Sequence, residues 1–162
     1  MAPTVSLWDC GEFIATSIIL GIPHPPGTPL YLIIGNFFSQ IPIFDDMGAR
    51  VNFISVIASA CAVMFLYMII VYLLDGPDSI FRERNHKNKI IKVYIPSFIA
   101  AITFSLTDAH WFNAVEAEVY SLSTFFTAII IWLILKWSKE NDSSKGIKYI
   151  IQIFEDEING HG

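Results

Sequence analysis

Two carboxylic acids three positions apart are the first residues whose spacing could support chemistry. They are Asp9 and Glu12, in the segment WDCGEF. If this segment is helical, both side chains lie on one face, because residues three apart are neighbours on a helix. Such a pair can act as a general base and its support, or can bind a cation. The alternative is a pair of solvated loop acids, since this spacing is common.

A histidine lies among prolines a short distance further along the chain. His24 belongs to the run PHPPGTP, in which four of the seven residues are proline. Proline fixes the backbone and disfavours a helix, so the run predicts a stiff corner that holds the imidazole in one orientation. A histidine held in this way can hydrogen-bond a phosphate or transfer a proton. The alternative is a structural turn with an incidental histidine.

A third group of polar residues falls in the block SLTDAHWFNAVEAEVYSL, between two apolar stretches. Asp108 and His110 are candidates to cap a helix or line a pocket. Glu116 and Tyr120, four apart, are predicted to share a helix face that Glu118 does not share. Acids that line a cavity at the end of a membrane helix are usually functional. The alternative for the two glutamates is the favourable placement of acids at a helix N-terminus.

Metal, nucleotide and nucleic-acid chemistry have little support in the sequence. The acids and the two separated histidines, His24 and His110, lack the spacing of a zinc site. There is no Walker loop, GxGxxG or GxSxG motif. The two cysteines, Cys10 and Cys61, are expected to be unpaired. A formal net charge of −5 without a basic patch argues against a nucleic-acid partner.

The composition predicts that membrane-spanning helices position these residues. Hydrophobic residues make up 54% of the 162-residue chain and charged residues only 15%, against about 25% charged residues in soluble domains. Residues 51–74 form an uncharged stretch that would be about 36 Å long as a helix, enough to cross the ~30 Å core of a bilayer. The shorter apolar stretches at 90–107 and 117–137 are predicted to be the second and third transmembrane helices.

The lysines and arginines predict which side of the membrane each connection faces. Nine of the ten lie within residues 82–92 or after residue 135, and only Arg50 lies elsewhere. With three spans these two segments share a side, which the positive-inside rule makes cytoplasmic. The tail at 138–162 is then cytoplasmic, whereas residues 1–50 and the polar link at 108–118 are extracytoplasmic.

Residues 28–41 are predicted to form an amphipathic helix within the extracytoplasmic segment. The segment is too short to span a bilayer, so its apolar face is expected to lie along the membrane surface. The alternative is an ordinary buried helix. The apolar positions have the spacing of one helix face: Leu30, Ile33, Ile34, Phe37, Phe38 and Ile41. Small residues within 55–62 also predict that the first span packs closely against more helices than three.

Three blocks in consistent order resemble one family of multi-pass membrane proteins. The blocks are PTVSLWDCGEFIAT, HPPGTPLYLIIGNFFS and FSLTDAHWFNAVEAEVYSLSTFF, and the match runs from Pro3 to about Trp137. The family that they resemble is the protein O-mannosyltransferase-like family, also known as domain of unknown function 2723 or glycosyltransferase family 117. The resemblance covers only the N-terminal part of a family member. The chain is therefore expected to lack flanking helices and to have a truncated tail.

The resemblance implies a GT-C glycosyltransferase, which uses a sugar linked to a polyprenyl phosphate. Asp9 matches the catalytic acid, and Glu12 is assigned as a second catalytic residue, although Cys10 and Gly11 separate two acids that are adjacent in related enzymes. The histidine of an HPP motif is matched by His24. The residues assigned to substrate binding are His24, Asp108, His110, Glu118 and Tyr120.

The sequence therefore predicts an all-α integral membrane protein, polytopic and GT-C-like, with about three transmembrane helices and a surface-lying amphipathic helix. Residues 1–137 are expected to be the N-terminal part of its membrane domain. The predicted reaction transfers a sugar, with mannose the candidate, from a polyprenyl-phosphate donor to a hydroxyl of a protein Ser/Thr or a glycan. We expect it on the extracytoplasmic face of a bacterial inner membrane.

The expected partners are membrane lipid, the lipid-linked sugar, the acceptor protein or glycan and the missing flanking helices. No cofactor is predicted beyond the lipid-linked donor, and these residues do not decide whether a divalent metal is required. The alternatives are a non-catalytic transport or assembly subunit and an inactive truncated fragment. This chain alone is expected to be inactive, because a GT-C site needs further helices.

Overall fold

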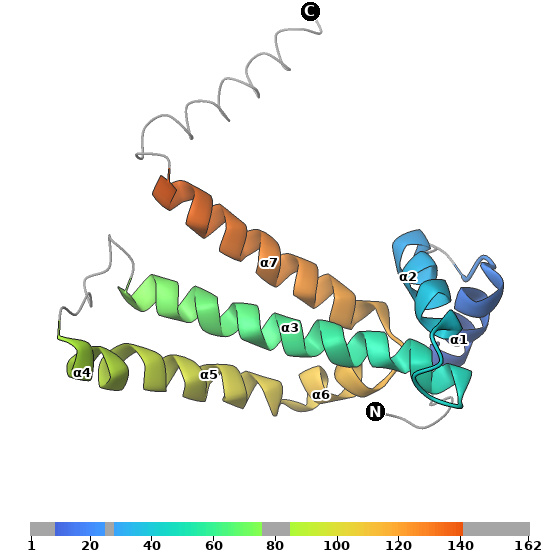
Figure 1. Ribbon diagram of the computed structural model, residues 1–162, viewed down its shortest axis with the longest axis horizontal. Helices are drawn as coiled ribbons and strands as arrows, with labels where there is room; N and C mark the ends of the chain where they lie inside the picture. The colour runs from blue at the N-terminus through green and yellow to red at the C-terminus, as the bar shows by residue number, and fades with distance from the viewer. Residues whose placement is uncertain (1–8, 25–27, 76–84, 141–162) are drawn as a thin grey trace, which may run out of the picture.

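A computed structural model describes residues 9–24, 28–75 and 85–140, and every element within them is helical (Figure 1). The all-α prediction is therefore confirmed for these residues. In chain order the elements are α1 (Cys10–Ile19), α2 (Pro29–Gln40), α3 (Met47–Asp75), α4 (His86–Lys89), the π-helix η1 (Ile90–Tyr94), α5 (Ile95–Ser105), α6 (Asp108–Val115) and α7 (Val119–Glu140).

Three helical rods run along the long axis of the molecule. The central rod is α3, with α7 on one side and the α4–η1–α5 rod on the other (Figure 1). By length and composition, α3 and residues 119–138 of α7 can each cross a membrane, with mean hydropathies of 2.6 and 1.8. The third rod and α6 together form another candidate span, bent by 65°. The described residues thus contain two candidate spans, or three if the bent pair is one span.

The third rod changes from a π-helical to an α-helical conformation close to a proline. Pro96 has no N–H to donate, and the π-helical turn η1 immediately precedes it. Ser97 donates a hydrogen bond of 2.6 Å from its hydroxyl to the carbonyl of Val93 across this junction. Beyond Ser105 the chain turns into α6, so the polar link at 108–118 contains a helix of eight residues.

One side of the apolar stripe of α2 faces outward, whereas Ile34 and Phe38 on its other side pack against the core of the protein. Leu30, Ile33 and Phe37 are 53%, 61% and 63% exposed. The residues that α2 buries are Tyr31, Leu32, Gly35 and Ser39. The exposed side of the stripe fits a helix at the membrane surface and the packed side fits a buried helix, so the placement of α2 at a lipid surface remains a prediction.

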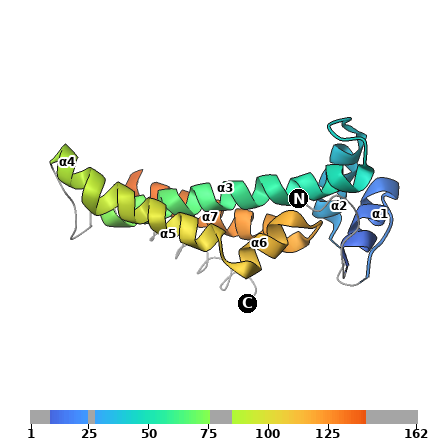
Figure 2. The same cartoon turned by 90° about the horizontal axis from the view of Figure 1, so that it is seen from below.

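The helix ends divide the described charges into two groups. We call the end formed by α1, α2, the first turns of α3 and residues 116–118 the acidic end. The end formed by the last turn of α3 with α4 and η1 is the basic end. The two lie at opposite ends of the molecule in both views (Figures 1 and 2).

A small core holds the acidic end together and joins four parts of the chain. It combines residues of α1, α2 and α3 with the segment before α7: Cys10, Phe13, Ile14, Tyr31, Leu32, Val51, Ile54 and Ala117. Arg50 fixes the turn between α2 and α3, because its guanidinium donates 2.6 Å to the carbonyl of Phe44 and 2.8 Å to that of Ser39. Burial of Ala117 in this core brings residues 116–118 beside the start of α1.

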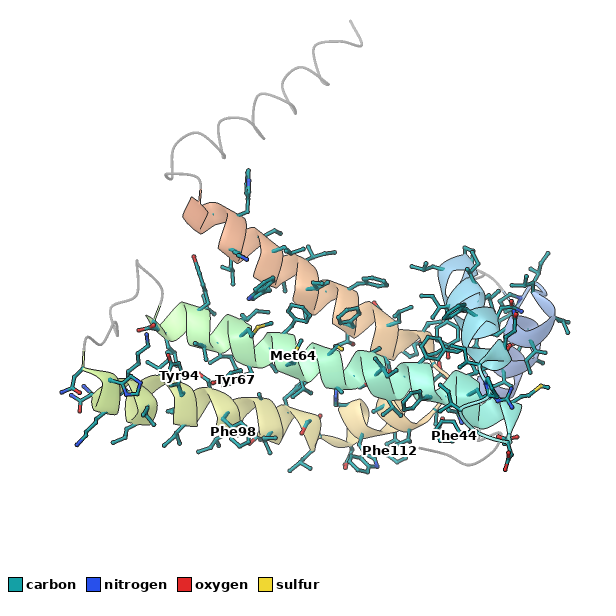
Figure 3. All side chains as sticks on the ribbon, in the orientation of Figure 1. Phe44, Met64, Tyr67, Tyr94, Phe98 and Phe112 are labelled. Carbon is teal, nitrogen blue, oxygen red and sulfur yellow. The ribbon has the colours of Figure 1, made fainter. Side chains whose placement is uncertain are left out.

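Away from this core, large apolar side chains cover much of the described surface. Phe98 on α5 and Phe112 on α6 are 60% and 64% exposed and point away from α3 (Figure 3). An apolar hollow of about 330 Å³ lies between α3, α5 and α7, and Leu66, Phe104 and Ile131 are part of its lining. Exposed apolar surface of this kind suits contact with lipid or with further helices.

Candidate functional site

Asp9 and Glu12 lie together at the start of α1. The carbonyl of Asp9 accepts the N–H of Phe13 at 3.0 Å, so the helical hydrogen bonding already begins at Asp9. Because the segment is helical, the condition for a shared face is met. Carboxylate oxygens of both residues and a ring nitrogen of His24 all lie within 4.8 Å of one another.

The return of the chain after α1 brings His24 to these acids. Leu20 takes the left-handed conformation at φ 50°, and Gly21 donates to the carbonyl of Thr16 at 2.8 Å. This closing turn reverses the chain, so that Pro23 and His24 lie back along the first turn of α1. Pro25 and Pro26 of the predicted corner lie outside the described residues.

Both carboxylate oxygens of Glu12 contact His24. Oε1 accepts the backbone N–H of His24 at 2.7 Å, and Oε2 lies 2.7 Å from the ring atom Nδ1. The other ring nitrogen, Nε2, faces Asp9 with 3.8 Å to Oδ2, which is an ion-pair distance but too long for a hydrogen bond. The ring of Phe13 supports the imidazole from one side, with 5.9 Å between ring centroids. Glu12 therefore fixes the imidazole, and Nε2 stays available for a ligand.

The electrostatics of this cluster favour a charged imidazole. The hydrogen bond to Glu12 raises the pKa of His24, and the negative charges of Glu12, Asp9 and Glu118 add to that effect, while desolvation opposes it. The same hydrogen bond, together with the backbone N–H of His24, lowers the pKa of Glu12. The side chains of Asp9, Glu12 and His24 are between 39% and 53% exposed, so solvent screens these interactions.

Glu118, which lies between α6 and α7, adds a further acid to this group. Burial raises the pKa of its carboxyl group, and the charges of Asp9 and Glu116 raise it further, while His24 opposes them. The Ser55 hydroxyl lies 3.5 Å from both the backbone nitrogen and the carbonyl oxygen of Glu118. A half-buried acid with a raised pKa beside a carboxylate and an imidazole is a candidate for holding a proton.

The predicted helix face around Glu118 is wrong. That prediction assumed one helix through residues 116–120, in which Glu116 and Tyr120 would share a face and Glu118 would point elsewhere. The structure ends α6 at Val115 and begins α7 at Val119, with three non-helical residues between them. The break lets Glu118 turn toward Asp9 and His24, while Tyr120 is 62% exposed.

The sequence analysis missed a set of buried polar contacts that hold this arrangement together. The Cys10 thiol lies 3.6 Å from Asn52 Oδ1, and its sulfur accepts the N–H of Ala117 at 3.4 Å. Cys10 and Cys61 are both unpaired, which confirms that prediction. The only amide side chain within residues 51–74 is Asn52, and an isolated amide in an uncharged span is the signal that could have indicated it.

Tyr31 adds a buried hydroxyl near the same group. Its side chain is 2% exposed, and its hydroxyl has no hydrogen-bond partner among the described residues. Burial raises the pKa of its phenol, and the charges of Cys10 and Glu118 add to this. The nearby Ser55 hydroxyl opposes the shift without meeting the distance and angle of a hydrogen bond.

Two other predicted substrate-binding residues lie on α6. Asp108 is the first residue of α6 and is exposed. The ring of His110 packs against that of Phe104 of α5, with 4.7 Å between the ring centroids. Within the described residues, neither forms a hydrogen bond or ion pair with Asp9, Glu12 or His24. The structure therefore does not bring Asp108 and His110 into the cluster that it forms from Asp9, Glu12, His24 and Glu118.

A cation is one ligand that this cluster could accept. One ligand atom from each of Asp9, Glu12 and His24 lies within 4.8 Å of the others, so the structure supplies a spacing that the linear sequence does not reveal. Glu12, however, already uses both oxygens on His24. A metal would therefore have to use Asp9 and Nε2 of His24, or displace the contacts of Glu12.

The fold and the site together define a class: helical membrane proteins with a cluster of acids and one imidazole at one end of the helices. Residues 9–154 match the family model described as protein O-mannosyl-transferase TMEM260 N-terminal domain. That match covers most of the chain, so the chain belongs to this family. The resemblance to protein O-mannosyltransferases is thereby confirmed.

Two curated relatives carry the same family name. The chain is 28% identical over 158 residues to protein O-mannosyl-transferase tmem260 of Dictyostelium discoideum, covering 96% of this chain and 16% of the relative. It is 28% identical over 131 residues to protein O-mannosyl-transferase TMEM260 of Mus musculus, covering 81% of this chain and again 16% of the relative. The chain thus spans about one sixth of the length of these relatives. No solved structure matches it.

Proposed function

We propose that this chain is the N-terminal catalytic part of a membrane glycosyltransferase. In this proposal the enzyme transfers a sugar, with mannose the candidate, from a polyprenyl-phosphate donor to a hydroxyl of a protein Ser/Thr or a glycan. The observation that carries the proposal is the convergence of Asp9, His24 and Glu118 at one end of the helices. Membership of a family named for O-mannosyl transfer supports the choice of reaction and sugar.

In the proposed chemistry, Asp9 is the general base and His24 stabilises the leaving phosphate. Asp9 accepts the proton of the acceptor hydroxyl as that oxygen attacks the anomeric carbon. The bond from this carbon to the donor phosphate breaks, and its electron pair remains on the phosphate oxygen. The protonated imidazole of His24 stabilises the negative charge of that oxygen. The products are the glycoside and the polyprenyl phosphate, with the proton on Asp9 returned to solvent.

The proposed orientation places the acidic end at the extracytoplasmic face. The lipid chain of the donor would then lie in the bilayer beside α3 and α7, with its phosphate at the water boundary. Lysines at the basic end support this orientation through the positive-inside rule. A bacterial inner membrane remains a prediction, and the two relatives named above come from eukaryotes.

The direct test is the Asp9→Asn variant of the full-length protein that contains this segment. We expect sugar transfer from a polyprenyl-phosphate mannose to an acceptor peptide to decrease by about 10²–10⁴-fold, because the general base is lost. Asp45→Asn is the matched control, since Asp45 is an exposed acid at the same end, outside the cluster. Wild-type turnover in Asp9→Asn would remove Asp9 from the mechanism. Specific binding of the donor without transfer by the wild type would favour the transport or assembly alternative.

A further inference from the structure

Glu12 and Asp9 contact His24 in different ways. One of its carboxylate oxygens accepts the backbone N–H of His24 and the other contacts Nδ1, each at 2.7 Å. Asp9 has only the 3.8 Å ion pair with Nε2 and an exposed side chain. A carboxylate that binds one partner through both oxygens is less free to take a substrate proton than one that keeps an oxygen without a hydrogen bond. The assignment of Glu12 as a second catalytic acid is therefore at odds with its contacts.

We propose that Glu12 is a positioning residue that holds the backbone and ring of His24, so that Nε2–H points past Asp9 toward the substrate. The catalytic part of this inference rests on the proposed glycosyltransferase function, whereas the positioning of His24 does not. The arrangement is the same in kind as the carboxylate that orients the histidine of a hydrolase triad. With Nδ1 committed to Glu12, the second ring nitrogen is the one that can face a ligand.

The charges around His24 determine whether the imidazole that Glu12 holds is neutral or protonated. Three groups face the ring from two elements: Glu12 and Asp9 at the start of α1, and Glu118 before α7. All three are acids, and among the described residues the ring of Phe13 also packs against the imidazole. The negative charges of these three described groups favour the imidazolium. An imidazolium carries a proton on Nε2 and can donate to the phosphate oxygen that leaves the sugar.

The step is balanced without a further reactant. The acceptor proton goes to Asp9, the bond from the anomeric carbon to oxygen breaks, and the electron pair stays on the phosphate. Nε2–H of His24 donates a hydrogen bond to that oxygen and keeps its proton. Glu12 makes no contact with either substrate and acts only through His24.

The test needs one readout that does not depend on activity. Hydrogen–deuterium exchange at C2 of histidine, followed by mass spectrometry across pH, gives the pKa of His24 in the full-length protein. We expect a pKa above 6.5, the ordinary value, in the wild type. It should decrease in Glu12→Gln, and decrease less in Glu12→Asp, which keeps the charge. Glu118→Gln should lower it less, because Glu118 contributes charge without a hydrogen bond. His110 in the same samples is the internal control.

The second readout is the pH profile of sugar transfer. Because His24 must be protonated, activity should decrease as pH rises through its pKa. In Glu12→Gln this decrease should begin at lower pH, and each unit by which the pKa falls should cost about tenfold in kcat on the alkaline side. Glu12→Asp should restore most of the profile. A role limited to folding would lower activity equally at every pH.

The outcomes separate this inference from the proposed function. If the wild type transfers no sugar but the pKa of His24 responds to Glu12→Gln, the positioning of His24 stands and the glycosyltransferase proposal fails. If Asp9→Asn abolishes transfer while Glu12→Gln changes neither the pKa nor the profile, the positioning role is wrong. Activity that requires a divalent cation bound through His24 would also overturn it, because an imidazolium cannot be a metal ligand.

Discussion

The acidic end and the basic end both contain opposite charges in contact, but the basic end pairs one lysine with one acid, whereas at the acidic end several acids share one imidazole. At the basic end, Lys89 forms a salt bridge with Asp75 and lies 5.7 Å from the ring centroid of Tyr94. At the acidic end, Asp9 and Glu12 contact one imidazole, the charge of Glu118 also acts on it, and Arg50 is hydrogen-bonded to backbone carbonyls.

From this difference we infer that the basic end holds helices together, whereas the acidic end serves a ligand or a reaction. A lysine paired with a carboxylate and an aromatic ring at a helix end is sufficient to tie two helices together. An excess of acids around one histidine gives no comparable advantage to stability, because like charges repel. Such an arrangement persists where it serves a ligand or a reaction. Changes at the two ends should therefore affect different properties of the protein.

Among variants that compare the two ends, the largest effect that we expect comes from the imidazole. His24→Gln keeps a polar side chain but cannot carry a positive charge, so sugar transfer by the full-length protein should decrease by about 10²–10³-fold. Lys89→Gln at the basic end is the matched control and should leave transfer unchanged. Equal loss of transfer in both variants would mean that the two ends do not differ in function.

The next effect concerns the close approach of α1 and α2. A Cβ atom at Gly35 would lie 2.7 Å from Cβ of Ser17, which the backbone of α1 fixes in place. Gly35→Ala should therefore destabilise the protein by about 1–3 kcal/mol, measured as a lower melting temperature in detergent. Gly21→Ala is the control, since its Cβ would lie 3.3 Å from the movable side chain of Ile19 and at an ordinary contact distance of 3.5 Å from Thr16. Equal melting temperatures for the two variants would contradict this packing.

A smaller loss should follow removal of the Cys10 thiol. Cys10→Ala leaves the N–H of Ala117 without its acceptor in the core, at a cost of about 1–2 kcal/mol. Cys61→Ala, on the half-buried side of α3, should change the melting temperature less. If Cys61→Ala proved the more harmful change, the link between α1 and residues 116–118 would not depend on the thiol.

The smallest effect is the pH dependence of the Glu12–His24 pair. The pKa of His24 is raised, so its stabilising contribution is full below 6.5 and is lost as pH rises through the raised value. The pKa of Glu12 is lowered, so its contribution is present above 4.5 and is lost as pH falls through the lowered value. The melting-temperature difference between wild type and Glu12→Gln should be largest between 4.5 and 6.5. A constant difference from low to high pH would contradict the hydrogen-bonded pair.

The membrane helices and half of the candidate site could be predicted because they depend on local patterns. An uncharged stretch long enough to cross a bilayer indicates α3 directly, and the spacing of Asp9 and Glu12 needs only one helical turn. The proline run similarly indicated that the chain would turn near His24. Each of these features is specified by residues within a short segment.

The rest of the site depends on contacts between distant segments, which no local pattern encodes. Glu118 reaches the cluster because three residues leave the helical conformation between α6 and α7, and the thiol of Cys10 meets Asn52 and Ala117 only in the folded chain. Helical periodicity continued through that break and so assigned Glu118 to the wrong face. Which side of the α2 stripe faces outward also depends on packing, since periodicity defines an apolar face but not what that face contacts.

The most direct test of the division into two ends is their placement across the membrane. Asp45→Cys and Lys87→Cys, made separately in the full-length protein without other exposed cysteines, can be treated with a membrane-impermeant maleimide before and after permeabilisation. We expect Asp45→Cys to be labelled in intact cells and Lys87→Cys only after permeabilisation. Labelling of both positions from the same side would contradict the separation of the acidic site from the basic end, and with it the proposed extracytoplasmic reaction.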